Sequence, residues 1–247
     1  MSTTRIEWTE RTWNPITGCS KASAGCQFCY AEVMARRLQA MGLQKYANGF
    51  TPTLHPACLD EPRAWRKPST VFVCSMSDLF HPEVPFDFIN RVMDTICETP
   101  QHTYQILTKR AARMEEYFSI RQAPSNAWLG VTVENREAKE RIDHLRTLEA
   151  SVRFLSCEPL LEDLGELELA GISWIIVGGE SGAQARRMRP EWAVGIRKQA
   201  EAHGIPFFFK QWGTWSAAGE RGSKKANGRM LEGRLVQELP SSLSLAI

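Results

Sequence analysis

Three closely spaced cysteines are the residues of this 247-residue chain whose types and spacing most clearly indicate chemistry. Cys19, Cys26 and Cys29 follow the pattern C-x6-C-x2-C. A cubane iron–sulfur cluster normally takes four thiolates, one for each iron. Three thiolates without an evident fourth would leave one iron open, and an open coordination position distinguishes a catalytic metal site from a structural one. The cysteines therefore predict a [4Fe–4S] cluster with one iron open to a small molecule.

Other uses of these cysteines stay open on the sequence alone. One is a zinc site completed by a distant ligand such as His55 or Cys58, although the sequence has no second C-x2-C or H-x3-H pair. Such a protein would be a zinc-stabilised module that binds nucleic acid without catalysis. Another is an iron–sulfur protein that carries electrons or serves as a structural partner, with its fourth ligand from Cys58 or from another chain.

The elements that must position the cysteines follow an alternating pattern. Short apolar runs rich in β-branched and aromatic residues alternate with segments of helical spacing. The runs predict strands near Thr12–Thr17 and at Val71–Met76, Thr103–Lys109, Ala127–Val133, Val152–Cys157, Ser173–Gly178 and Pro206–Gln211. The helical segments are Phe86–Thr99, Arg136–Leu148 and Pro190–Ala202. This alternation predicts an α/β fold, a partial or complete (β/α) TIM-like barrel of about six or seven parallel strands.

Polar and charged residues follow these strands at the end where barrels of this kind place their active sites. A charged side chain directly after a buried apolar run costs desolvation energy unless it is paired or functional. The charged residues that we expect on the substrate side of an active site are Lys109, Glu134, Glu158, Glu180 and Lys210. The alternative is that some of them pair with one another across the mouth of the barrel. His81, in the loop after the second strand, is a candidate proton carrier.

Composition bounds the class of protein. With 43% hydrophobic and 23% charged residues, the chain can bury a sizeable core. It has no apolar run of the roughly 18 residues needed to cross a bilayer, and its N-terminus lacks the apolar core of a signal peptide. We therefore expect a cytoplasmic protein without a membrane partner, whose cysteines are thiols and ligands rather than disulfides. The cysteines expected to be buried in the core are Cys58, Cys74, Cys97 and Cys157.

The net charge of +2 gives no overall signature of nucleic-acid binding, but basic residues form local clusters. One such cluster by itself is most often a solvated face, whereas several together fit a phosphate-bearing partner. The clusters are Arg36-Arg37, Lys109-Arg110, Arg186-Arg187-x-Arg189 and Arg221-x-x-Lys224-Lys225-x-x-x-Arg229.

The cysteine loop resembles the cluster loop of radical S-adenosylmethionine (SAM) enzymes, which also has an aromatic residue, here Phe28, between the last two cysteines. Its first gap is three residues longer than the commonest spacing of that superfamily. The resemblance implies that the open iron binds the amino and carboxylate groups of SAM. One electron from the cluster would then cleave SAM to a 5′-deoxyadenosyl radical. It also implies that Phe28 and Tyr30 lie near the bound SAM.

The same resemblance implies further SAM-binding residues. In the superfamily, a Gly-Gly-Glu motif after the second strand contacts the SAM amine. Here the corresponding position holds Ser75, Ser77 and Asp78, and the Asp78 carboxylate could accept a charge-assisted hydrogen bond from the SAM ammonium. The sequence Gly178-Gly179-Glu180 matches the motif itself but follows the sixth predicted strand. This pair of glycines is either a cofactor-binding element or a tight turn.

Ordered motifs over roughly residues 8–213 together resemble one family, the phage-associated three-cysteine family, long classed as a domain of unknown function. The motifs are Trp13–Cys19, Gly25–Ala31, Val71–His81, Leu107–Arg110, Trp128–Glu134, Ser156–Leu161, Val177–Gly182 and Phe207–Gly213. The family is similar to the radical SAM enzymes. The resemblance implies hypermodification of thymidine in viral DNA, where a radical SAM isomerase rearranges an amino acid attached to the methyl carbon of the base.

The partners that follow are a DNA or modified-nucleotide substrate in a phage or bacterial host cytoplasm and an electron donor such as flavodoxin or ferredoxin. RNA, a free nucleotide, a peptide and a small metabolite are alternative substrates, and the oligomeric state stays open. The tail from residue 214 is rich in Gly, Ser, Ala and charge. We therefore expect a barrel over residues 1–213 and a C-terminal extension over 214–247, with a small hairpin at Arg229–Leu239.

Overall fold

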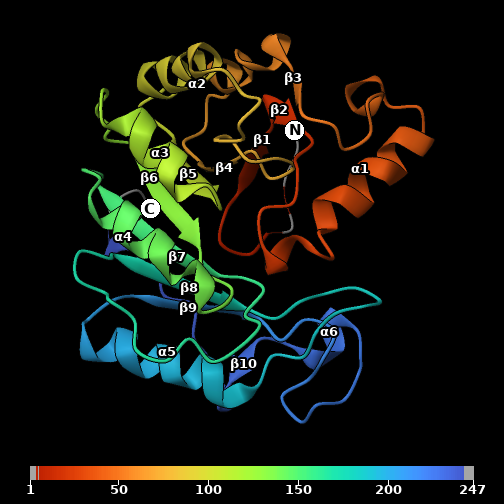
Figure 1. The fold of residues 1–247 in the computed structure, drawn as a ribbon, viewed down its shortest axis with the longest axis vertical. Coiled ribbons are helices and arrows are strands. Elements are labelled where there is room, and N and C mark those ends of the chain that lie inside the picture. The colour runs from red at the N-terminus through yellow and green to blue at the C-terminus, as the bar shows by residue number, and fades with distance from the viewer. Residues whose placement is uncertain (1–3, 5, 242–247) are drawn as a thin grey trace. The chain divides into compact units, whose positions relative to one another are not determined.

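The computed structural model describes residues 4 and 6–241 (Figure 1). The outermost residues of the two predicted regions, 1–3, 5 and 242–247, lie outside this description. Within the described residues, no helix is both long enough and apolar enough to cross a membrane.

One sheet of seven parallel strands, in the order β1-β4-β5-β6-β7-β8-β9, forms the framework of the described chain (Figure 1). Because the order in the sheet follows the order in the sequence, each strand is joined to its parallel neighbour by a crossover connection. The strands are β1 (Arg11–Trp13), β4 (Thr70–Val73), β5 (Thr103–Thr108), β6 (Ala127–Thr132), β7 (Val152–Cys157), β8 (Trp174–Gly178) and β9 (Phe207–Gln211). The prediction of an α/β fold of the (β/α) type with six or seven parallel strands is confirmed.

Two predicted strands differ in detail. The segment near Thr12–Thr17 forms β1 and a separate short strand, β2 (Ile16–Thr17), which pairs antiparallel with β3 (Thr53–Leu54). The run predicted to extend to Met76 ends at the last residue of β4, because Cys74 adopts a positive φ of 60° that cannot continue a strand.

Helices occupy most of the connections between strands. Those predicted are α2 (Phe86–Glu98), α5 (Pro190–Ala202) and α4 (Glu140–Arg146), the last preceded by a 3-10 turn at Glu137–Lys139. Those not predicted are α1 (Tyr30–Ala40) and α3 (Ala111–Phe118). Pro190 opens α5 at a position where a helix has no use for a backbone N–H, so its fixed φ favours the helix.

The described chain divides into two compact units, each with its own core. The first contains the chain up to Ala22, Cys29–Gly130 and Thr147–Ser151. Its core is supplied largely by β4, β5 and the apolar face of α2, where Ile89, Val92 and Met93 are fully buried.

The second unit contains Ser23–Phe28, Val131–Arg146 and the chain from Val152 onward. Helix α4 packs on β7, and α5 packs on β8 and β9. The strands β7 and β8 are buried along almost their whole length, as an apolar parallel sheet covered on its faces requires.

The C-terminal segment of the second unit covers the edge of β9. The predicted hairpin is confirmed as β10 (Met230–Leu231) and β11 (Arg234–Leu235), and it follows the short helix α6 (Lys224–Asn227). Beyond the hairpin, the backbone N–H of Phe209 donates to the carbonyl of Val236 at 2.8 Å. Glu238 donates in the same way to Phe207 at 3.1 Å. These antiparallel contacts satisfy backbone groups that an open edge strand would expose.

The scattered cysteines are buried only in part. All seven cysteines of the chain lie among the described residues, and none forms a disulfide. Cys74 and Cys157 are buried as expected, and Cys58 is half-buried. The prediction is wrong for Cys97, which is exposed because it lies one position beyond the buried Ile96 on α2.

The core of the second unit gives a test of the fold. Ile176 in β8 is fully buried, so Ile176→Ala removes apolar contacts and leaves a cavity. We expect the free energy of unfolding to fall by about 2–5 kcal/mol, measured by urea denaturation. Leu239→Ala, at a side chain that is 43% exposed, is the control and should cost less than about 0.5 kcal/mol. Equal losses in the two variants would contradict this core.

Candidate functional site

Gly18 sets the backbone path into the first cysteine. It has a φ of +81°, and a Cβ atom there would lie 2.2 Å from the carbonyl oxygen of Thr51, so only glycine fits. Its N–H donates to the carbonyl of Met76 at 3.1 Å, and the N–H of Cys19 donates to that of Phe50 at 3.0 Å. Cys19 is therefore held by backbone contacts on both sides of the chain.

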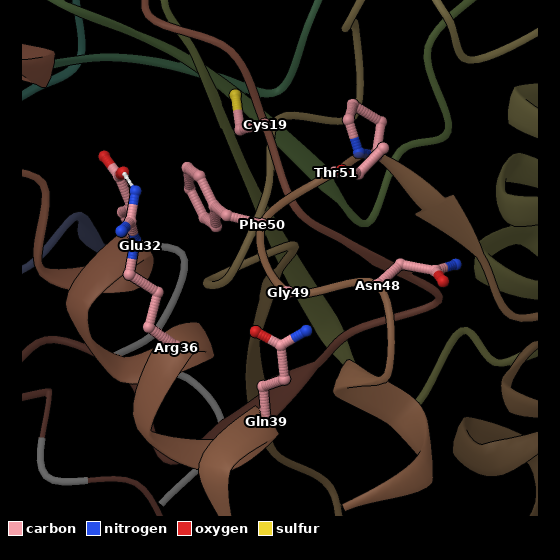
Figure 2. Close-up of a pocket in the computed structure, with 9 residues that line it drawn as sticks. Cys19, Glu32, Arg36, Gln39, Asn48, Gly49, Phe50 and Thr51 are labelled. Atoms are coloured by element: carbon pink, nitrogen blue, oxygen red, sulfur yellow. Dashed lines mark hydrogen bonds and ion pairs between the residues drawn. The ribbon is translucent and has the colours of Figure 1, made fainter.

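An open pocket lies beside Cys19 in the first unit (Figure 2). In this view the Phe50 ring lies between the cysteine and α1, whose Glu32 and Arg36 form an ion pair at 2.7 Å. Cys29, the residue that caps the N-terminus of α1, packs against the same cluster of side chains as Phe50. Phe50 thus lines the pocket beside Cys19 and packs on the cluster that Cys29 also contacts.

Asp78 lies in the first unit, buried at the end of β4, with its carboxylate oxygens bonded to its own chain. The Thr108 hydroxyl donates to Oδ1 at 2.7 Å, and the backbone N–H of Lys109 donates to Oδ2 at 3.1 Å. The Arg110 guanidinium lies 3.8 Å from the carboxylate. Asp78 therefore joins the loop after β4 to the end of β5.

Ser20, the residue after Cys19, is held by Arg110 and His81, which lie beside Asp78. Arg110 Nη2 donates to the carbonyl of Ser20 at 3.1 Å and to its hydroxyl at 3.0 Å. The Ser20 hydroxyl also lies 2.7 Å from Nε2 of His81. Because the backbone N–H of Glu83 points at Nδ1 of His81, the Nε2 atom carries the ring proton and donates to Ser20. Burial and the nearby Arg110 charge lower the pKa of His81, which favours this neutral form.

The other predicted SAM residues of the first unit bond to nearby backbone. The Tyr30 hydroxyl donates to the carbonyl of Ser75 at 2.5 Å, and the Ser77 hydroxyl donates to that of Ile16 at 2.9 Å. Asn14 Oδ1 accepts from the Ser75 hydroxyl at 3.2 Å. The turn after β4 is therefore tied both to the start of α1 and to β2.

Glu134 occupies a comparable position in the second unit. It follows β6 and is inaccessible to solvent. The Ser23 hydroxyl and the Gly25 N–H both donate to its Oε1, while Arg141 Nη1 donates to Oε2 at 2.9 Å. A Cβ atom at Gly25 would lie only 2.9 Å from Oε1, so a glycine lets the loop approach this closely. Glu134 thus holds the turn that contains Cys26.

A second carboxylate, Glu180, acts on the same turn through Arg186. Two guanidinium nitrogens of Arg186 donate to the Glu180 carboxylate at 2.6 and 2.9 Å, a bidentate geometry. A third donates to the carbonyl of Ala24 at 3.0 Å. The guanidinium carbon lies 5.2 Å from the centre of the Phe28 ring, within the range of a cation–π contact.

Four more of the predicted residues lie near the ends of β7, β8 and β9. Lys210 Nζ is 3.1 Å from Glu158 Oε2, so this pair realises the alternative of charges pairing with each other. A Cβ atom at Gly178 would lie 2.4 Å from the Glu158 carboxylate, and one at Gly179 would lie 2.0 Å from the carbonyl of Trp212. The two glycines therefore make room for neighbouring groups, as a tight turn requires.

The cysteine loop offers three sulfur donors, which are the ligands that an iron–sulfur cluster takes. Cys19, Cys26 and Cys29 are partly exposed thiols. Among residues 4 and 6–241, no three His, Cys, Asp or Glu side chains already form a metal-binding set. Cys58, the alternative fourth ligand, lies on the 3-10 turn Pro56–Cys58, where Lys45 Nζ is 3.2 Å from its sulfur. Burial raises the pKa of the Cys58 thiol.

The sequence does not predict several residues that shape the site. Arg186 stands out only as part of a basic cluster, and Ser20, Ser23 and Arg141 do not stand out at all. For the two serines, the available signal is a hydroxyl residue within the cysteine loop, because serine commonly bonds to nearby loop groups.

Comparison with known proteins gives a family and a fold. Residues 3–240 match the model of a family described as "Protein of unknown function (DUF5131)". No curated protein matches the chain.

Among solved structures, the chain is similar to one of spore photoproduct lyase complexed with dinucleoside spore photoproduct. The identity is 10% and the TM-score is 0.50, over 81% of this chain and 63% of that one. A mutant of that lyase with bound AdoMet and dinucleoside spore photoproduct gives a TM-score of 0.48 at 10% identity, over 72% and 57% of the two chains. The first similarity shows a shared fold, and the chain spans about 63% of the length of that lyase chain.

Removing the charge of Glu134 tests its role in holding the loop. Glu134→Gln keeps the shape but leaves the Arg141 cation without its carboxylate, which should cost about 3–5 kcal/mol in the free energy of unfolding. Hydrogen exchange followed by mass spectrometry should show faster exchange in residues 23–28, because the Gly25 N–H donates to this carboxylate. Glu137→Gln, at an exposed residue of the same connection, should change neither. Unchanged exchange in the Glu134 variant would refute this role.

Proposed function

We propose that this chain, which belongs to the DUF5131 family of proteins of unknown function, is a radical SAM enzyme. Cys19, Cys26 and Cys29 would hold a [4Fe–4S] cluster with one open iron. The fold of the similar structure, a spore photoproduct lyase, is compatible with this proposal.

The observation that carries the proposal is the scaffolding of the cysteine loop. Side chains from distant parts of the chain hold the residues next to the cysteines: His81 and Arg110 contact Ser20, and Glu134 and Arg186 contact the turn before Cys26. A structural zinc site orders its own loop, since the metal supplies folding energy. A catalytic site needs its ligands positioned by surrounding residues. The scaffolding therefore favours the catalytic use of the cysteines over the zinc module.

The bound cluster would supply one electron that cleaves SAM to a 5′-deoxyadenosyl radical, which abstracts hydrogen from the substrate. Ser75, Ser77 and Asp78 form the turn that we assign to SAM. Since both Asp78 oxygens accept hydrogen bonds from the chain, this carboxylate positions Lys109 and Arg110 rather than serving as an open acceptor.

In the second unit, we assign Phe28 to SAM binding because Arg186 fixes one face of its ring. Gly178 and Gly179 allow the backbone after β8 to lie close to its neighbours, which shapes this end of the sheet. The Glu158–Lys210 pair is assigned to the substrate. It is partly exposed, so it can exchange its internal contact for one to substrate and hold or pass a proton.

The proposed substrate is a modified nucleobase in DNA, with isomerisation of an amino acid attached to thymidine as the specific reaction. Exposed basic residues support a phosphate-bearing substrate. Arg187 packs over Gly219, and Arg221 donates to the carbonyl of Ala183, so two basic clusters that are distant in sequence meet in the second unit. A base within a duplex would have to be flipped out to react.

The decisive experiment is anaerobic. The protein is reconstituted with iron and sulfide, SAM and dithionite are added, and 5′-deoxyadenosine is measured by mass spectrometry. We expect about four iron and four sulfide per chain. Cys26→Ala should abolish both the cluster and the product, because it removes one of three ligands.

Cys58→Ala is the matched control, since it removes a cysteine outside the loop. It should retain the cluster and the product. Loss of the cluster in this variant would support the non-radical iron–sulfur protein instead. One zinc per chain, with neither cluster nor product, would support the zinc-stabilised module and refute the proposed function.

A further inference from the structure

The outward side of α1 and the turn after it carry an unusual concentration of exposed apolar side chains. Nine large hydrophobic side chains are exposed among the described residues, and five of them lie between residues 30 and 43. They are Tyr30, Val33, Met34, Met41 and Leu43. The four on or next to the helix follow the spacing i, i+3, i+4 and i+11, so they form one stripe. We call these five residues the α1 face.

The helix docks on the rest of the first unit through another side. That side buries Ala31 and Ala35, which pack with Tyr46 and Met76 in a small cluster. The apolar stripe is exposed to solvent, although the helix is already docked on the protein. Such an exposed apolar patch indicates an interaction surface.

The charge around the α1 face is positive. From residue 20 to residue 59 the chain has four Lys or Arg residues and one acidic residue, a net charge of +3. That acid, Glu32, is ion-paired with Arg36, while Arg37 and Lys21 are exposed. A partner for this surface therefore carries negative charge.

The α1 face also begins at the cysteine loop. Cys29 is the N-cap of α1, and the Val33 N–H donates to its carbonyl at 3.3 Å. With a rise of 1.5 Å per residue, Val33 lies about 6 Å along the helix axis from this proposed cluster ligand. A protein docked on the α1 face would thus stand close to the metal.

We propose that the α1 face is the docking surface for an acidic one-electron carrier protein, a reduced flavodoxin-type flavoprotein, which reduces the cluster. This rests on the proposed function. The carrier is oxidised by one electron and the cluster is reduced by one, with no bond formed or broken. A small interface with adaptable methionines suits such a transient partner. A second copy of the chain would bring two basic surfaces together, and nucleic acid would gain little from the apolar stripe.

The test uses Val33→Glu/Arg37→Glu, which places negative charge on the α1 face and touches no residue assigned to SAM or to the cluster. Binding of flavodoxin to the reconstituted protein is measured by isothermal titration calorimetry, and cluster reduction by stopped-flow absorbance. We expect binding to weaken at least tenfold and flavodoxin-driven reduction to slow at least tenfold. Dithionite, a small reductant that needs no docking surface, should give the same yield of 5′-deoxyadenosine as with the wild-type chain, within twofold.

The matched control is Ile120→Glu/Arg91→Glu, which makes the same changes at an exposed apolar residue and an exposed arginine elsewhere in the first unit. It should bind flavodoxin like the wild-type protein. A measurement without any variant supports it: raising NaCl from 50 to 500 mM should slow reduction by flavodoxin and not by dithionite.

The proposal is overturned if the α1-face variant binds and accepts electrons like the wild-type chain. It is also overturned if flavodoxin binding is unchanged while self-association, binding to duplex DNA or binding to anionic phosphatidylglycerol vesicles is lost. Failure of the proposed function has a different signature, since the wild-type protein would then give no 5′-deoxyadenosine even with dithionite.

Discussion

The placement of the cysteine loop depends on carboxylates that are buried at the strand ends and must find donors there. Glu134 is inaccessible to water, and a buried carboxylate without partners costs several kcal/mol. Its donors are Arg141 from α4 and the chain at Ser23 and Gly25. The Glu134 carboxylate has all of these donors only when the segment Ser23–Gly25 lies against the end of β6. Formation of the strand end and placement of the turn before Cys26 are therefore energetically coupled.

Two other buried carboxylates at strand ends accept hydrogen bonds from different donors. Asp78 accepts from Thr108 and from the backbone after β5, and Glu180 holds Arg186, which in turn binds the carbonyl of Ala24. Acidic residues at strand ends are expected to be catalytic in a barrel, yet here three of them orient other groups. The Glu158–Lys210 pair differs, because it remains partly exposed to solvent. Burial thus distinguishes the strand-end carboxylates that orient the loop from the one that stays accessible.

The sequence predicted the sheet well because burial on both faces leaves an apolar run that periodicity detects. It predicted the end of β4 poorly, since the positive φ of Cys74 depends on its surroundings and has no signature in the residue type. It identified Glu134 as a charged strand-end residue but not its donor Ser23, which is 111 residues away. It placed Arg186 in a basic cluster, although a buried carboxylate neutralises this arginine. The local pattern of apolar residues indicates which segments are buried. Which side chain a buried charge binds depends on the tertiary structure, which brings distant residues together.

The net charge of the chain also fails to predict how charge is distributed over the structure. A net charge of +2 over 247 residues suggests an electrically neutral surface, but the total hides the segment around α1, which is +3 within 40 residues. Burial then decides what that segment can do, because Glu32 is paired while Arg37 is exposed. Exposed methionines beside such charge are unfavourable in water, on a helix whose buried residues are alanines. Their position next to a cysteine that we assign to an electron-accepting cluster is the reason we propose that a partner covers this surface.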